Sequence, residues 1–142
     1  MSYAAKTFGY SFGAIYVLLS LVGFGITGFS EWLETDVDYH LVIFRMNAAQ
    51  NALHMLLGIA LMAGAADTEA FARRVALVAG LVFGGIGIWG FYAYESEWNV
   101  IATNEATSLL HLATAAVALV AAVASQPADS SAEADAPAEE AG

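Results

Sequence analysis

Four long runs of this sequence contain no charged residue, and they decide what the chain can fold into. They cover Thr7 to Ser30, Met46 to Ala66, Val75 to Tyr94 and Ala106 to Ser125. Each has about 20 residues or more, enough to cross a hydrocarbon layer of about 30 Å at a helical rise of about 1.5 Å per residue. A soluble chain of 142 residues has too small an interior to bury all four runs. The sequence therefore predicts a polytopic membrane protein.

The runs indicate helices rather than strands. Spanning strands alternate apolar and polar residues, whereas Leu109 to Val123 is continuously rich in Ala, Leu and Val. A helix also satisfies its own backbone hydrogen bonds in lipid. The expected fold is an all-α membrane four-helix bundle in one domain, residues 1–125, with spans at about 8–29, 47–66, 72–94 and 105–125.

The end of the chain has a different composition. Residues 126–142 are mainly Ala, acidic residues, Ser and Pro, with no large apolar side chain. Such a segment cannot bury enough apolar surface to offset the entropy lost on ordering. We expect a disordered acidic tail.

Composition narrows the function classes. The chain carries four Lys and Arg against fourteen Asp and Glu, a net charge of −10, and no cysteine. Without cysteine there is no disulfide and no thiolate metal site. Without a basic patch, nucleic acid is not expected as a partner. The strongly acidic, Lys-poor composition suggests a halophilic source, where salt screens self-repulsion.

The few cations predict an orientation. Lys6, Arg73 and Arg74 flank one side of the predicted spans, whereas the other connections hold six acidic residues and only Arg45. The positive-inside rule then places both termini in the cytoplasm of a multi-pass protein of the cell (plasma) membrane. In the longest connection, the apolar stretch Leu41 to Phe44 predicts a short interfacial helix or re-entrant turn, with an irregular loop as the alternative.

The two halves of the chain repeat each other. Asn47 to His54 and Asn104 to His111 both read Asn-x6-His with Leu before the His. The preceding spans also align, because Gly13-x2-Tyr16 matches Gly80-x2-Phe83 and each is followed, at the same spacing, by Gly-Phe. This pattern predicts two repeated helical hairpins related by an axis along the membrane normal.

These motifs resemble a known family. The pattern Phe44-Arg-Met-Asn47-x3-Asn51-x2-His54-x3-Gly58 and the second Asn-x6-His are similar to DUF4383 (domain of unknown function 4383), a family of four-helix integral membrane proteins. The resemblance covers roughly residues 8–124. It implies a four-span topology and no established activity. The sequence departs from the family pattern at Ser108, where the second half often has a longer polar residue, and in its acidic tail.

Two polar clusters are the candidate site. Three polar residues share one face of each helix, at positions i, i+4 and i+7; they are Asn47, Asn51 and His54 in one half and Asn104, Ser108 and His111 in the other. Each His lies about 10 Å below the helix start, and a polar group at that depth should face the bundle interior.

Three interpretations of these clusters remain open. The first is polar packing across helices. The second is a haem or metal site with His54 and His111 as ligands. The third is a proton or small-solute path. Two His without a carboxylate or Cys are too few for a closed zinc site, so no metal is assigned. His40 is expected to be solvated.

The sequence shows no phosphate-binding loop, no Ser-His-Asp order and no His-Glu-x2-His motif, so we expect no enzyme and no cofactor. The predicted function is a non-enzymatic scaffold or accessory subunit; the alternative is a haem- or metal-binding or transport protein using the two His. The expected partner is the lipid bilayer, with a homo-oligomer or a larger membrane complex left open. Gly9-x3-Gly13 and Gly80-x3-Gly84 predict close packing within one bundle, with a dimer interface as the alternative.

Overall fold

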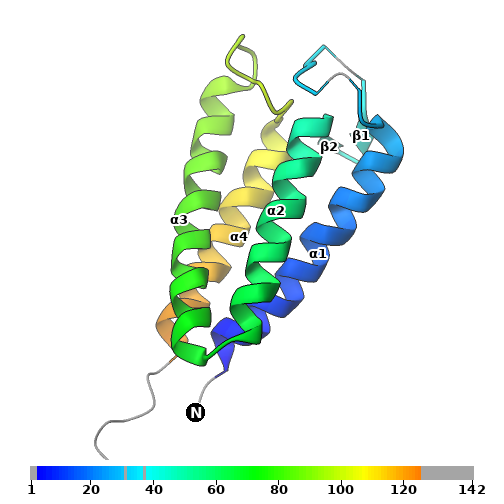
Figure 1. The fold of residues 1–142 in the computed structure, drawn as a ribbon. Coiled ribbons are helices and arrows are strands. Elements are labelled where there is room, and N and C mark those ends of the chain that lie inside the picture. Colours follow the sequence, from blue (N-terminus) through cyan, green and yellow to red (C-terminus); the bar gives the residue numbers. More distant parts are fainter. Residues whose placement is uncertain (1–2, 31, 37, 126–142) are drawn as a thin grey trace, which may run out of the picture.

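Four helices form the body of the protein, shown in Figure 1. The computed structural model describes residues 3–30, 32–36 and 38–125. The helices are α1 (Ala4–Thr27), α2 (Ala48–Ala66), α3 (Glu69–Ala93) and α4 (Glu105–Ala124). The all-α four-helix prediction is confirmed. The acidic tail predicted at 126–142 lies outside the described residues.

All four helices are long and apolar enough to cross a membrane. Large apolar side chains point away from the bundle on every helix, with exposed fractions of 60–67% at Leu18, Leu56, Leu81 and Val120. In water such a surface would aggregate, whereas in a bilayer it contacts lipid. The chain is a multi-pass membrane protein.

The helices form two hairpins. α1 packs mainly against α2, and α3 packs mainly against α4, which confirms the predicted hairpin pairing. Small residues allow the close approach: a Cβ atom added at Gly13 would lie 2.8 Å from the Gly58 carbonyl oxygen, and one at Gly80 would lie 2.8 Å from the Leu119 side chain. An added Cβ atom at Gly84, the second glycine of the predicted Gly80-x3-Gly84 pair, would meet only Ala115, at 3.7 Å. The other close approaches of α3 to α4 are at Gly87 and Gly90.

Two hydrogen bonds tie the end of the bundle at which α1 begins and α4 ends; we call it the termini end. The Ser125 hydroxyl, just after α4, accepts from the Ala5 amide at 2.8 Å. The Arg73 side chain donates through Nε to the Ala122 carbonyl at 2.9 Å. A cation at the C-terminal end of α4 complements the helix dipole. α3 begins at Glu69, earlier than the predicted residue 72, and includes Arg73 and Arg74, as the predicted span did.

A small β-hairpin covers the opposite end of the bundle, the hairpin end. Strands β1 (His40–Leu41) and β2 (Phe44–Arg45) pair antiparallel, with Leu41 opposite Phe44. The two-residue turn between them needs positive φ, and Val42 supplies it at +61°. The structure therefore shows a β-hairpin at Leu41 to Phe44, in place of the predicted short helix or the alternative irregular loop; a re-entrant turn at this segment stays a prediction. Val42 is 86% exposed.

The interior changes character along the bundle axis. Towards the termini end it is apolar and made largely of small side chains, namely Ala72, Ala76, Ala79, Ala115, Ala118, Ala121 and Ala122. Towards the hairpin end it is polar, with Asn, Gln, His, Ser and Thr side chains buried between the helices. The polar half holds the candidate site.

Candidate functional site

Two histidines meet between the two helical hairpins. His54 of α2 and His111 of α4 are 3% and 1% exposed, and their Nε2 atoms lie 3.1 Å apart. The rings are nearly perpendicular, at 79°. One imidazole must donate to the other, so a neutral pair requires opposite tautomers. The two repeat-related histidines are thus brought into one pair.

Aromatic rings from the other two helices enclose this pair. Tyr16 of α1 meets His54 edge-on, with ring centroids 5.0 Å apart, and Phe83 of α3 lies 5.7 Å from His111. Tyr16 and Phe83 occupy matching repeat positions and contact each other at 4.7 Å. The Tyr16 hydroxyl is bonded to the Thr114 hydroxyl at 2.8 Å. Each helix therefore contributes to one central cluster.

The two asparagines that open the motif cap their helices. Asn47 Oδ1 accepts from the Gln50 amide at 2.9 Å, and Asn104 Oδ1 accepts from the Thr107 amide at the same distance. Their backbones are nearly identical, with φ of −131° and −133° and ψ of 178° in both. This is the usual role of Asn at a helix start. The repeat seen in the sequence is also a repeat of local geometry.

The same asparagines tie each half to the loop of the other. Asn47 Nδ2 donates to the Val100 carbonyl at 3.1 Å, and Asn104 Nδ2 donates to the Ile43 carbonyl at 2.9 Å. Val100 and Ile43 each lie four residues before the capping Asn of their own half. The two bonds are therefore equivalent under the repeat, and each helix cap also joins the halves.

Asn51 and Ser108, the remaining members of the predicted clusters, do not bond to the histidines. Asn51 Nδ2 donates to the Thr27 hydroxyl at 3.0 Å, within the first hairpin. The Ser108 hydroxyl lies 3.4 Å from that of Thr103, just before α4. The six predicted residues are thus divided into two groups. His54 and His111 form the central pair, and the other four make hydrogen bonds nearer the hairpin end.

A glycine makes room for each of these two polar side chains. A Cβ atom added at Gly23 would overlap the Asn51 amide, and one at Gly90 would overlap the Ser108 hydroxyl. These are the glycines of the repeated Gly-Phe pair in α1 and α3. Their repetition reflects the space that a polar side chain needs on the facing helix.

Some buried polar atoms of the site have no hydrogen-bond partner among the described residues. They are both amide atoms of Gln50, Asn51 Oδ1 and His111 Nδ1. Gln50 and His54, with Thr107 and five apolar side chains, line a cavity of about 10 Å³. An unpaired buried polar group is unfavourable unless water or an ion reaches it.

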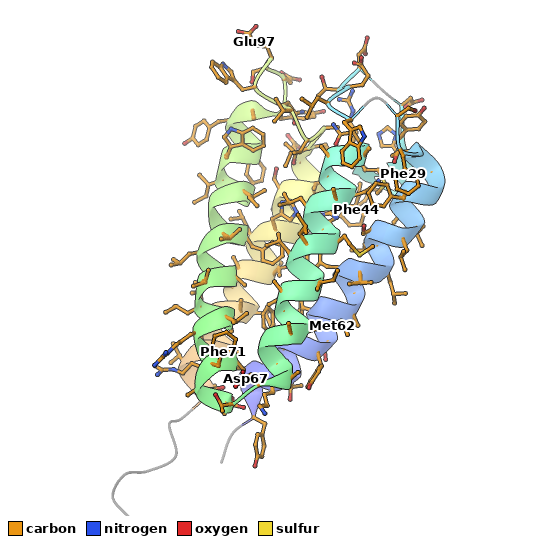
Figure 2. The ribbon with its side chains drawn as sticks, viewed as in Figure 1. Phe29, Phe44, Met62, Asp67, Phe71 and Glu97 are labelled. Atoms are coloured by element: carbon orange, nitrogen blue, oxygen red, sulfur yellow. The ribbon has the colours of Figure 1, made fainter. Side chains whose placement is uncertain are left out.

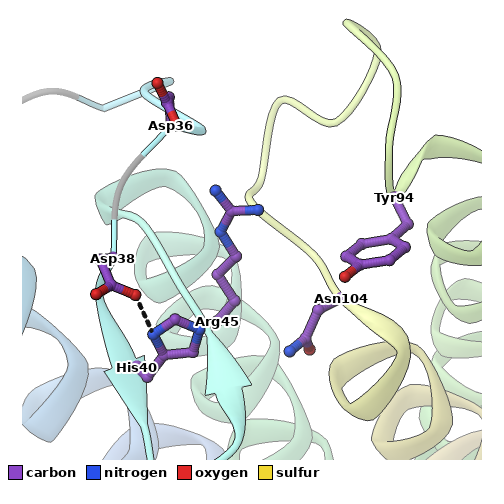
Figure 3. Close-up of a pocket in the computed structure, with 6 residues that line it drawn as sticks. All are labelled: Asp36, Asp38, His40, Arg45, Tyr94 and Asn104. Carbon is purple, nitrogen blue, oxygen red and sulfur yellow. Dashed lines mark ion pairs between the residues drawn. The ribbon is translucent and has the colours of Figure 1, made fainter.

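A wider pocket of about 350 Å³ opens between the two loops of the hairpin end (Figure 3). Its lining is Asp36, Asp38, His40, Arg45, Tyr94 and Asn104. His40 Nδ1 lies 3.2 Å from Asp38 Oδ1, and the Asp38 side chain is fully exposed. Across the described residues no three His, Cys, Asp or Glu side chains are grouped to hold a metal ion. Charges of both signs in an open pocket define no ligand.

Several residues of the site were not predicted from the sequence. Gln50 and Thr107 could have been found, because they occupy the same position in the two Asn-x6-His motifs. Tyr16 and Thr114 are isolated polar groups inside apolar spans, which is a weaker signal. Nothing in the spacing of either residue indicates that the two would meet across 98 residues of chain.

Comparison with curated proteins gives no match, and comparison with solved structures gives none either. The suggested halophilic source therefore stays a prediction from composition. A family model, Domain of unknown function (DUF4383), matches residues 6–124, a range that includes all four helices except the first two residues of α1. The model thus covers both hairpins, the histidine pair and both capping asparagines. The chain belongs to the DUF4383 family.

Proposed function

We propose that the chain is a non-enzymatic structural protein of the cell membrane, a scaffold or accessory subunit. The observation that carries this proposal is the hydrogen bond between His54 and His111. These two deeply buried ionisable groups of the polar half are engaged with each other. They join the hairpins instead of facing a cavity in which a substrate could lie.

The position of the polar groups supports the same role. Thr114 lies ten residues beyond the Asn104 cap, about 15 Å along the helix. Beyond it the interior is closed by buried alanines such as Ala118, which has no exposed surface. A proton or solute path needs polar groups or water over the whole hydrocarbon layer of about 30 Å. The polar cluster reaches about half of that depth.

The orientation we propose places both termini in the cytoplasm. Lys6, Arg73 and Arg74 belong to the termini end, where Figure 2 shows Asp67 and Phe71, whereas Glu97 lies at the hairpin end. A cytoplasmic excess of Lys and Arg is the usual bias of membrane proteins. Reporter fusions after residue 142 and within 31–38 should report opposite sides of the membrane. Reports from one side would contradict this orientation.

Transport is tested with purified protein in lipid vesicles that contain a pH-sensitive dye. We expect no proton flux above that of protein-free vesicles under an imposed pH gradient. Flux that disappears in His54→Ala and His111→Ala, but persists in the surface variant His40→Ala, would refute the structural role. The same vesicles loaded with a small-solute reporter test solute transport.

Metal binding is the second candidate, because the Nε2 atoms of His54 and His111 lie 3.1 Å apart. Two ligands on one tetrahedral ion, at bonds of about 2.0–2.1 Å, would lie about 3.3 Å apart. Haem fits less well, because axial nitrogens on opposite sides of the iron would lie about 4 Å apart with a porphyrin between them. Metal analysis of purified protein decides: about one ion per chain, lost in both His variants, would favour this candidate.

A further inference from the structure

Gln50 is buried without a partner at the edge of the histidine pair. It lies on α2, one turn before His54, and is 1% exposed. Neither its amide nitrogen nor its amide oxygen has a hydrogen-bond partner among the described residues. Buried amides are nearly always hydrogen-bonded, and an exception often marks a water molecule. The amide thus offers one donor group and one acceptor atom to a small ligand.

The cavity beside Gln50 has the size and lining of a water site. Its volume of about 10 Å³ is close to the smallest that admits one water molecule. Gln50, His54 and Thr107 supply its polar groups, and the Thr107 hydroxyl, which donates to Asn104 Oδ1 at 2.8 Å, still has a free lone pair. A bound water needs two to four such partners. A larger solute would not fit.

The β-hairpin forms part of the wall of this cavity. Leu41 and Phe44 contribute from β1 and β2, and Met46 from the segment that follows. Met46 is 2% exposed. The cavity therefore lies between the β-hairpin and the histidine pair, at the polar end of the interior.

We propose that Gln50, His54 and Thr107 bind one internal water molecule beneath the β1–β2 hairpin. This water hydrates the histidine pair from the hairpin end. Through it, the imidazole N–H proton of the pair exchanges with solvent, although both rings are buried. The site exists in one half only. Thr107 occupies the position of Gln50 in the second half, but its short side chain is already bonded to its own helix cap.

Magnetic resonance on protein in lipid bilayers tests the proposal, with histidine labelled by ¹⁵N and magnetisation transferred from water. Only three histidines are present, so single His→Gln variants assign the rings. In the wild type we expect transfer to the His54 ring. In Gln50→Leu and in Gln50→Met, whose side chain has a similar length, we expect that transfer to fall several-fold. The control Ser11→Ala removes an exposed hydroxyl that does not line the cavity and should leave transfer to His54 unchanged.

Two results would overturn the water site. The first is the absence of transfer to the His54 ring in the wild type, while the His40 ring, whose side chain is 39% exposed, receives it. The second is unchanged transfer in either folded Gln50 variant. Thermal unfolding gives an independent check. If water is the partner of Gln50, both apolar variants keep a midpoint near that of the wild type, whereas a large fall in both would mean that the amide bonds to protein.

Discussion

The imidazoles of His54 and His111 are joined nitrogen to nitrogen at 3.1 Å, across 57 residues of chain. The two side chains occupy the same position in the two halves, so each residue meets its own counterpart. Because each Nε2 either donates or accepts, two equivalent residues must take different roles. The bond belongs to neither half alone, and removing either ring measures its contribution to stability.

Removing either histidine should destabilise the bundle, because the other ring is left buried without its partner. For His54→Ala and His111→Ala we expect losses of about 1–2 kcal/mol each in the free energy of unfolding. The double variant should lose clearly less than the sum of the two, which is the signature of a direct interaction. Unfolding in detergent or bicelles measures all three. Strict additivity would argue against the pair, and the exposed His40→Ala is the control.

The capping asparagines should show two separable effects. Asn47→Ala and Asn104→Ala lose both the helix cap, worth about 1 kcal/mol, and the bond to the loop of the other half. Asn→Ser at either position keeps a capping hydroxyl but is too short to reach Val100 or Ile43. We therefore expect Ser variants between wild type and Ala in stability. Equal stability of Ser and wild type would show that the ties between the halves contribute nothing.

The sequence was sufficient for the parts of the fold that depend on one helix at a time. Absence of charge located the spans, and positions i, i+4 and i+7 placed His54 and His111 on inward faces. It could not identify the partners, because spacing along one helix says nothing about which side chain arrives from another. Asn51 illustrates this limit: it shares the face of His54, yet it bonds to Thr27 of α1.

The β-hairpin could not be predicted for a different reason. A short apolar run such as Leu41 to Phe44 is compatible with helix, strand or loop. The usual signal of a two-residue hairpin is Gly or Asn in the turn, and here the position with φ of +61° is Val42. The surrounding contacts, including the bond from Asn104 to the Ile43 carbonyl, hold a conformation that the local sequence disfavours.

Relieving this backbone strain should stabilise the protein. A β-branched residue at positive φ is disfavoured by about 1–2 kcal/mol, whereas glycine adopts the conformation freely. Val42→Gly should therefore raise the free energy of unfolding by up to about 1 kcal/mol, after the greater freedom of glycine in the unfolded chain is subtracted. Thermal unfolding is the measurement. Ile43→Gly, outside the positive-φ position, should give no gain; equal gains from both would disprove the explanation.

Glycines of α3 that face α4 should respond to substitution differently from glycines that face outward. Gly90→Ala should cost about 1–3 kcal/mol, because the new methyl group overlaps the Ser108 hydroxyl. The double variant Gly90→Ala, Ser108→Ala should recover part of that loss, since the overlapping oxygen is gone. Gly85 meets nothing within 4 Å of an added Cβ, so Gly85→Ala should stabilise α3 by about 0.5–1 kcal/mol through helix propensity alone. Unfolding midpoints and the oligomeric state are measured together. If Gly85→Ala instead destabilises the protein and shifts it towards monomer, the outward face of α3 packs against a second copy of the chain.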